Sequence, residues 1–258
     1  MKLVCYILLF FTTSLFSQET VTVELLDKQA NKLDLISVDN FKTSYALTNN
    51  TLIKKTLDHT LNYSNIQLGD ITSANTFNPL KINVFYKDFN TAIILDNRLA
   101  EIFKIDFNTI KNYKSISHIS TGGDNTIWVF NQDNQQLELF DYKANKTRIF
   151  TLPILSEVLD MQSNYNYCWL LTKDFLYTYS YFGSMIQKIK NEGFTEIAQT
   201  NENLILKKEN RLFYLRNDTT QPIEIKLPKL LIKAFFVNVE TLYIYDSEFL
   251  YKYQLKTN

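Results

Sequence analysis

Residues 122–142 read GGDNTIWVFNQDNQQLELFDY. The segment holds two runs in which apolar and polar residues alternate, TIWVF and LELFDY, and a polar stretch separates them. This pattern predicts a β-hairpin. Because an isolated two-stranded hairpin is only marginally stable in water, the hairpin needs further strands to pack against.

The hairpin recurs along the chain. Its first strand is expected at 44–48, 91–95, 126–130, 167–171, 203–207 and 241–245. The polar turns that follow start at residues 49, 96, 133, 173, 209 and 247, so the period is 36 to 47 residues. One apolar run precedes each hairpin and a weaker one follows most of them. Four short strands in about 40 residues are typical of a β-propeller blade, and we predict six blades.

Three details complete the predicted ring. The longest spacing indicates a loop at 74–81 between the first two blades. The last unit lacks a fourth strand, whereas 20–26 (TVTVELL) precedes the first unit without a partner. We therefore expect the N-terminal strand to close the last blade and to cover its open edge. A pair of β-sandwiches is the alternative fold.

The N-terminal residues are typical of an export signal. Met1-Lys2 is followed by the apolar run LVCYILLFF and by small residues up to Ser17. We expect residues 1–17 to be a signal peptide and 18–258 to form a single propeller domain. Cleavage would leave Cys168 as the sole cysteine, which we expect to be a buried hydrophobic residue.

The charges of the chain are balanced. Lys and Arg total 27, and Asp and Glu total 27. The chain therefore has no excess of positive charge that would favour nucleic acid as a partner. No segment after the leader is long and apolar enough for a membrane helix. We expect an exported monomer. Its location would be the periplasm, the outer membrane or the extracellular space.

Residues 122–142 resemble the propeller repeats of bacterial ligand-binding sensor domains and their exported relatives. In those repeats a Gly-Asp-x-Thr-Ile/Leu-Trp run opens the second strand of each blade. Here Gly123-Asp124-Asn125-Thr126-Ile127-Trp128 matches this run, and Cys168-Trp169 is a partial second copy. The resemblance implies a propeller, but it implies no activity, because propellers serve as binding modules and as enzymes.

The polar turns supply the candidate binding residues. If all six turns face the same way, their side chains surround one mouth of the channel, where they would bind a basic partner or a cation. The residues in this set are Asp96, Asn97, Asp133, Asn134, Lys173, Asp174, Glu209 and Asn210. The alternative explanation is that tight turns favour Asp and Asn for backbone reasons.

Other chemistry-bearing residues are sparse. His118 is expected on an inner strand that lines the channel, and His59 on an exposed outer turn. Two histidines support neither a His-based triad nor a multi-histidine metal site, so we assign no catalytic residue, metal or cofactor. Trp128 and Trp169 are expected between blades instead of forming a sugar-binding platform. Asp218-Thr219-Thr220 is similar to a short O-glycosylation acceptor, with Thr219 as its target.

The sequence therefore favours a non-enzymatic exported β-propeller, acting as a protein-interaction or scaffold module with a protein partner in the bacterial cell envelope. The alternative is a carbohydrate-binding or small-molecule-binding protein, or a hydrolase, with its site at the channel mouth. A third hypothesis is a sensor or assembly subunit.

Overall fold

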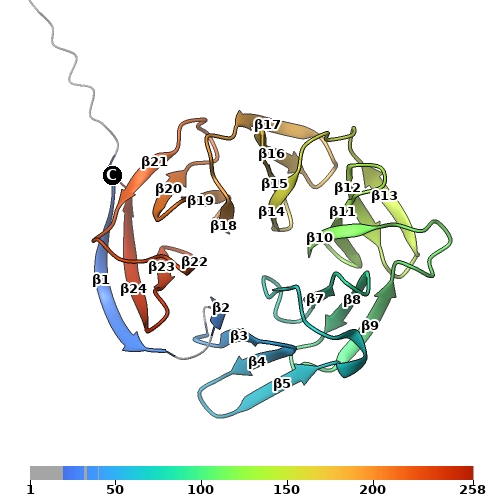
Figure 1. Ribbon diagram of the computed structural model, residues 1–258, viewed down its shortest axis with the longest axis horizontal. Coiled ribbons are helices and arrows are strands. Elements are labelled where there is room, and N and C mark those ends of the chain that lie inside the picture. Colours follow the sequence, from blue (N-terminus) through green and yellow to red (C-terminus); the bar gives the residue numbers. More distant parts are fainter. Residues whose placement is uncertain (1–19, 32–33, 40, 258) are drawn as a thin grey trace, which may run out of the picture.

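The computed structural model describes residues 20–31, 34–39 and 41–257. These residues form twenty-four strands and one short 3-10 helix, η1 (Ile66–Leu68). The sheets stand around a central axis in a ring, which is a β-propeller (Figure 1). The predicted signal peptide at 1–17 lies outside the described residues. In the described part of the chain, no helix is long and apolar enough to cross a membrane.

Four sheets each contain four antiparallel strands in chain order. The first is β2 (Asp34–Val38), β3 (Ser44–Thr48), β4 (Thr51–Lys55) and β5 (Thr60–Ser64). The second is β6 (Ser73–Asn75), β7 (Ile82–Tyr86), β8 (Thr91–Leu95) and β9 (Glu101–Asp106). The third is β10 (Ile116–Thr121), β11 (Thr126–Asn131), β12 (Gln136–Asp141) and β13 (Lys146–Phe150). The fourth is β14 (Val158–Ser163), β15 (Tyr167–Thr172), β16 (Phe175–Ser180) and β17 (Met185–Lys190).

The remaining eight strands form one sheet of order β18-β19-β20-β21-β1-β24-β23-β22. One half is β18 (Glu196–Thr200), β19 (Asn203–Lys208), β20 (Arg211–Leu215) and β21 (Ile223–Lys226). The other half is β22 (Ala234–Asn238), β23 (Thr241–Tyr245), β24 (Phe249–Thr257) and β1 (Val21–Ala30).

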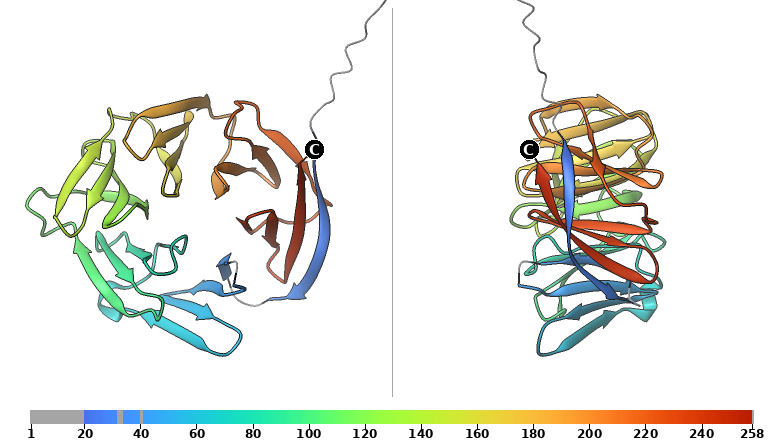
Figure 2. Two further views of the ribbon diagram at one scale, coloured as in Figure 1. Left: turned by 180° about the vertical axis from the view of Figure 1, so that it is seen from behind. Right: turned by 90° about the vertical axis from the view of Figure 1, so that its left-hand side faces the viewer.

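The N-terminal strand pairs with the C-terminal strand, as predicted. β1 lies antiparallel to β24 through nine residue pairs, from Val21↔Thr257 to Ala30↔Phe249. Figure 2 shows the two strands side by side in both views. β1 also pairs in parallel with β21, through Val21↔Ile225 and Thr22↔Lys226. This second contact joins two halves into one sheet, so six separate blades are not observed.

The central strands are buried on both faces because each sheet packs against its two neighbours. Trp128 on β11 and Cys168 on β15 are fully buried in one cluster between the third and fourth sheets. Trp169 points the other way and packs against Leu204 and Leu215 of the β18–β21 half. The predicted burial of Cys168 and the predicted positions of both tryptophans between sheets are therefore confirmed.

The predicted register of the second unit is wrong by one strand. The run 91–95 forms β8, which is the third strand of its sheet. The repeat pattern instead grouped this run with segments that form second strands in the other sheets. The segment 74–81 is not a loop between blades, because it contains the end of the inner strand β6 and its connection to β7. β6 has only three residues, Ser-Ala-Asn, so it carries no apolar alternation that the sequence could reveal.

The inner strands of the sheets end on the same side of the ring. Hydrogen bonds near those ends join neighbours: Asn75 Nδ2 to Ser120 Oγ at 3.2 Å, Ser163 Oγ to Ser120 Oγ at 2.7 Å, and Thr200 Oγ1 to the Val239 carbonyl at 2.6 Å. We call this side face 1. It carries the connections between first and second strands, which include residues 39 and 41–43, 76–81, 122–125, 164–166, 201–202 and 239–240. Face 2 carries the turns between second and third strands.

A buried ion pair links the third sheet to the loop that leads into it. Lys114 Nζ lies 2.6 Å from Glu138 Oε2, and both residues are at least 90% buried. Asn131 Nδ2 and the Thr147 hydroxyl also donate to the Glu138 carboxylate, at 2.8 and 2.5 Å. The carboxylate is thus fully paired in a region without solvent.

Replacing Lys114 with Met should destabilise the protein by roughly 3–5 kcal/mol, because a buried carboxylate then loses its cation. The free energy of unfolding in urea measures the effect. A second substitution, Glu138→Gln, should restore over half of the loss, because it removes the unpaired charge. The exposed pair Arg211–Glu224, at 3.5 Å, supplies the control: Arg211→Met should cost less than about 1 kcal/mol.

A chain that lacks residues 1–30 should self-associate. Without β1, the edge of β24 is unpaired, and Leu255 and Tyr253 lose the cover that Val21 gives their cluster. Light scattering after size-exclusion chromatography should show dimers or larger species for the shortened chain. A shortened chain that stays monomeric with an unchanged melting temperature would contradict the closing role of β1.

Candidate functional site

The central cavity is the first candidate site. It has a volume of about 660 Å³ and is lined by residues of all six inner strands, β2, β6, β10, β14, β18 and β22. Its volume lies in the range of about 300–1,000 Å³ that is usual for small-molecule sites. The wall carries four titratable groups, Asp39, Lys87, His118 and Asp160, among hydroxyl and amide side chains.

His118 lies in the channel wall, as predicted. Its Nδ1 is 2.9 Å from the hydroxyl of Ser117. Burial, helped by the positive charge of Lys87, lowers the pKa of His118 from 6.5 to about 4. The imidazole is therefore neutral at pH 7. His59, in contrast, lies on an exposed turn between β4 and β5, also as predicted, and contacts Thr56.

Asp160 is an acidic group of the channel wall, and no sequence pattern singled it out. Its Oδ2 accepts a hydrogen bond from the Ile197 N–H at 2.8 Å, and its Oδ1 accepts one from its neighbour Met161. Burial outweighs these hydrogen bonds and raises the pKa of Asp160 from 3.8 to about 6. The carboxylate thus connects β14 to β18 through a hydrogen bond. Its pKa of about 6 lies close to neutral pH.

The mouth of the channel on face 1 is ringed by exposed apolar side chains. Phe41 is 82% exposed, Phe77 41%, Tyr165 47% and Val239 45%, and each lies in or beside a connection between a first and a second strand. The rings of Phe77 and Tyr165 meet edge to face, with centroids 5.1 Å apart. We call Phe41, Phe77, Tyr165 and Val239 the apolar mouth.

Gly122 and the Gly-Asp-x-Thr motif that follows it shape this mouth at the third sheet. A Cβ on Gly122 would lie 2.5 Å from the Thr126 hydroxyl, so only glycine fits. That hydroxyl donates to the Gly123 carbonyl at 2.5 Å and closes the turn. The loop at 76–81 reaches across it: Lys81 donates to the Asp124 carbonyl, and Phe77 contacts Tyr165 of the fourth sheet.

The polar turns named from the sequence do not all share one face. Asp133, Asn134, Lys173, Asp174, Glu209 and Asn210 lie on face 2, between second and third strands. Asp96 and Asn97 lie between β8 and β9, at the opposite end of the sheet, because the second unit was misaligned by one strand. The predicted grouping of all eight residues around one mouth is therefore wrong.

Several of these side chains form hydrogen bonds within the protein. Asp133 Oδ2 accepts from the Ser115 N–H at 3.0 Å, and Asp174 Oδ2 accepts from the Ser156 hydroxyl at 2.7 Å. Asn210 bonds to the backbone of Leu230 and Ile232, and Asp96 accepts from the N–H groups of two residues in its own turn. Asn97, Asn134, Lys173 and Glu209 have exposed side chains. Asp96 thus supports the backbone explanation, whereas Asp133, Asp174 and Asn210 bind other segments of the chain.

The sequence reasoning missed the apolar mouth. A signal was available: Phe41, Phe77 and Tyr165 are aromatic residues within polar turns, and each is adjacent to an asparagine. Within the described ranges no group of three or more His, Cys, Asp or Glu side chains is arranged to hold a metal ion.

The acid sensitivity of folding should depend on His118. Between pH 6.5 and about 4 the unfolded chain binds a proton at this residue that the folded chain does not bind, so the free energy of unfolding falls as the pH falls. His118→Gln should therefore lose less stability than the unmodified chain between pH 7 and pH 4, measured by urea unfolding.

Asp160 should act in the opposite direction. Between pH 6 and 3.8 the folded chain binds its proton first, which adds stability as the pH falls. Asp160→Asn should thus lose more stability on acidification than the unmodified chain. Parallel pH profiles for both variants would contradict this assignment.

No protein-family model matches the chain, and no curated protein matches its sequence. Solved structures match its fold. A streptogramin B lyase has a TM-score of 0.62 at 13% identity, over 87% of this chain and 78% of the other. Virginiamycin B lyase from Staphylococcus aureus, catalytically inactive and with quinupristin, has a TM-score of 0.58 at 12% identity, over 88% and 99%. A chain of the Mitotic Checkpoint Complex has a TM-score of 0.56 at 9% identity, over 90% and 95%. At these identities the comparisons show a β-propeller fold and nothing finer.

Proposed function

We propose that this chain is a non-enzymatic, exported β-propeller that binds a protein partner in the bacterial cell envelope through face 1. The observation that carries this proposal is the apolar mouth. Aromatic side chains that are exposed around a concave centre are typical anchors of protein interfaces.

The loops that present the apolar mouth are held in place before any partner binds. Asp39 Oδ1 accepts from the Phe41 N–H at 2.8 Å, and Asn75 Oδ1 accepts from the Phe77 N–H at 3.1 Å. Beside Tyr165, Asn164 Oδ1 accepts from the N–H of Tyr167 at 2.8 Å. Such turns reduce the entropy that a loop loses on binding, and this favours a preformed interaction surface.

We further propose that the ring has six blades. The parallel contact between β21 and β1 involves two residue pairs, whereas β1 and β24 share nine. On this interpretation the eight-stranded sheet is two blades that touch at their outer edges. Export rests on the leader-like sequence at 1–17. The checkpoint-complex chain of similar fold belongs to a protein assembly, which is compatible with a role in protein binding.

A second candidate is a small polar ligand, such as a carbohydrate, in the central cavity. The cavity volume of about 660 Å³ and the polar groups around His118 and Asp160 favour it. It ranks second because Trp128 and Trp169 are buried and supply no stacking surface in the channel.

In-cell crosslinking of the tagged chain, followed by mass spectrometry, tests the leading proposal. We expect one dominant envelope protein, crosslinked to loops of face 1. Phe41→Ser combined with Tyr165→Ser should reduce its recovery at least about 30-fold, because each aromatic anchor of an interface contributes roughly 2 kcal/mol.

Lys173→Glu combined with Glu209→Lys provides the matched control. Both side chains are exposed on face 2, and the exchange leaves the net charge unchanged. Recovery should not change. If this exchange abolishes recovery while the face 1 variant retains the partner, then the partner binds the turns predicted from the sequence, and the proposed face is wrong.

A further inference from the structure

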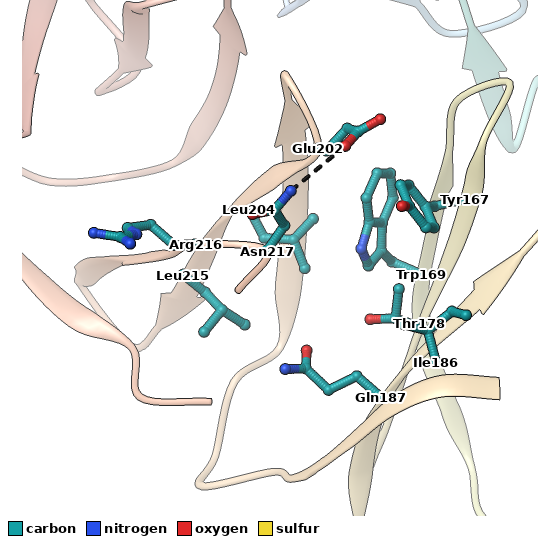
Figure 3. A pocket seen from close by; sticks show the side chains of 10 residues that line it. All are labelled: Tyr167, Trp169, Thr178, Ile186, Gln187, Glu202, Leu204, Leu215, Arg216 and Asn217. Atoms are coloured by element: carbon teal, nitrogen blue, oxygen red, sulfur yellow. Dashed lines mark hydrogen bonds between the residues drawn. The ribbon is translucent and has the colours of Figure 1, made fainter. Parts of the chain in front are cut away.

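A second, smaller cavity opens between the fourth sheet and the β18–β21 half. It has a volume of about 60 Å³, which is far below the size of a usual small-molecule site and can admit only part of a long side chain. Figure 3 shows its lining, with Trp169 on one side, Leu204 and Leu215 on the other, and Glu202 above. Glu202 belongs to a face 1 loop, so a partner on this face would cover the cavity.

Trp169 gives the cavity an unused hydrogen-bond donor. The side chain is 3% exposed and its ring packs 5.8 Å from the ring of Tyr167. Its indole nitrogen is directed into the cavity in Figure 3, and it donates no hydrogen bond to any residue that the structure describes. A ligand that brings an acceptor to this N–H would gain a hydrogen bond here.

Glu202 gives the rim a fixed negative charge. It is a non-glycine residue at φ 68°, in the left-handed region, directly after Asn201 at φ 46°. Its carboxylate accepts from the side-chain amides of Asn166 at 2.8 Å and of Asn217 at 3.4 Å. Both donors are neutral, so they hold the carboxylate in place without cancelling its charge. Backbone strain of this kind is often kept at functional sites.

The nearby cation does not neutralise Glu202. Arg216 forms two hydrogen bonds with Asp218, at 2.9 and 2.6 Å, and this ion pair carries no net charge. In Figure 3 the Arg216 guanidinium points away from the cavity. The rim therefore presents the Glu202 carboxylate, held by two neutral amides, above an apolar floor.

We propose that this cavity binds one lysine or arginine side chain of the protein partner. The aliphatic stem packs on Leu204, Leu215 and the indole, the cationic head reaches the Glu202 carboxylate, and a backbone carbonyl of the same residue accepts from the Trp169 indole. Charge-assisted hydrogen bonds and a cation near an indole ring both favour such a ligand. The assumption that this side chain belongs to a protein rests on the proposed function.

A titration without the partner tests the recognition itself. The ¹⁵N-labelled chain contains two tryptophans, and Trp169→Phe assigns the indole N–H signal of residue 169. N-acetyl-lysine methylamide and N-acetyl-arginine methylamide are added as probes. We expect the Trp169 indole signal to shift in a saturable manner and the Trp128 signal to stay in place. N-acetyl-norleucine methylamide, which has the lysine stem without its charge, should produce at most a small shift.

Two charge variants separate the pocket from the general field of face 1. Glu202→Gln keeps the side-chain shape and should abolish the shift. Glu240→Gln removes the same charge from another face 1 turn and should retain it. No shift with either basic probe, an equal shift with norleucine, or an unchanged shift in Glu202→Gln would each overturn the inference. These results do not depend on the crosslinking experiment, so the pocket can fail while partner binding stands, and the reverse also holds.

Discussion

The pairing of β1 with β24 is the contact on which the ring depends. Every other sheet is built from strands that follow one another in the chain, so each forms through short connections. The last sheet takes its outer strand from residues 21–30, more than 200 positions away from 249–257. The entropic cost of closing such a long loop grows only slowly with its length. Nine residue pairs and the burial of Val21 and Leu255 offset that cost.

Closure also decides how the channel is formed. Once the ends are joined, the six inner strands share one axis, and short polar bonds such as Ser163–Ser120 and Thr200–Val239 connect them near face 1. These bonds hold the connections between first and second strands at a common height. Exposed residues that lie far apart in the chain, Phe41 and Val239 among them, can then form a single mouth.

The two faces use polar residues differently. On face 2, side chains such as Asp133 and Asp174 bind the segment that leads into their own sheet, so much of their hydrogen-bonding capacity is used internally. On face 1, Asp39 and Asn75 bind the backbone of the next residues and thereby leave aromatic rings exposed. The same residue types thus stabilise a turn in one place and present a contact surface in the other.

Periodicity alone determined the β-propeller fold, because apolar residues that alternate in strands with a 40-residue repeat have few other ways to bury both faces of every sheet. It also determined the closing strand, the buried tryptophans and the channel position of His118. Local pattern failed at β6, whose three residues are too short and polar to alternate, and this shifted Asp96 and Asn97 to the wrong face. Only the tertiary structure decided which turns share a face, that Asp160 is buried in the channel, and that Trp169 and Glu202 meet at one cavity. Those relations arise between sheets, where no sequence spacing reports which side chains come together.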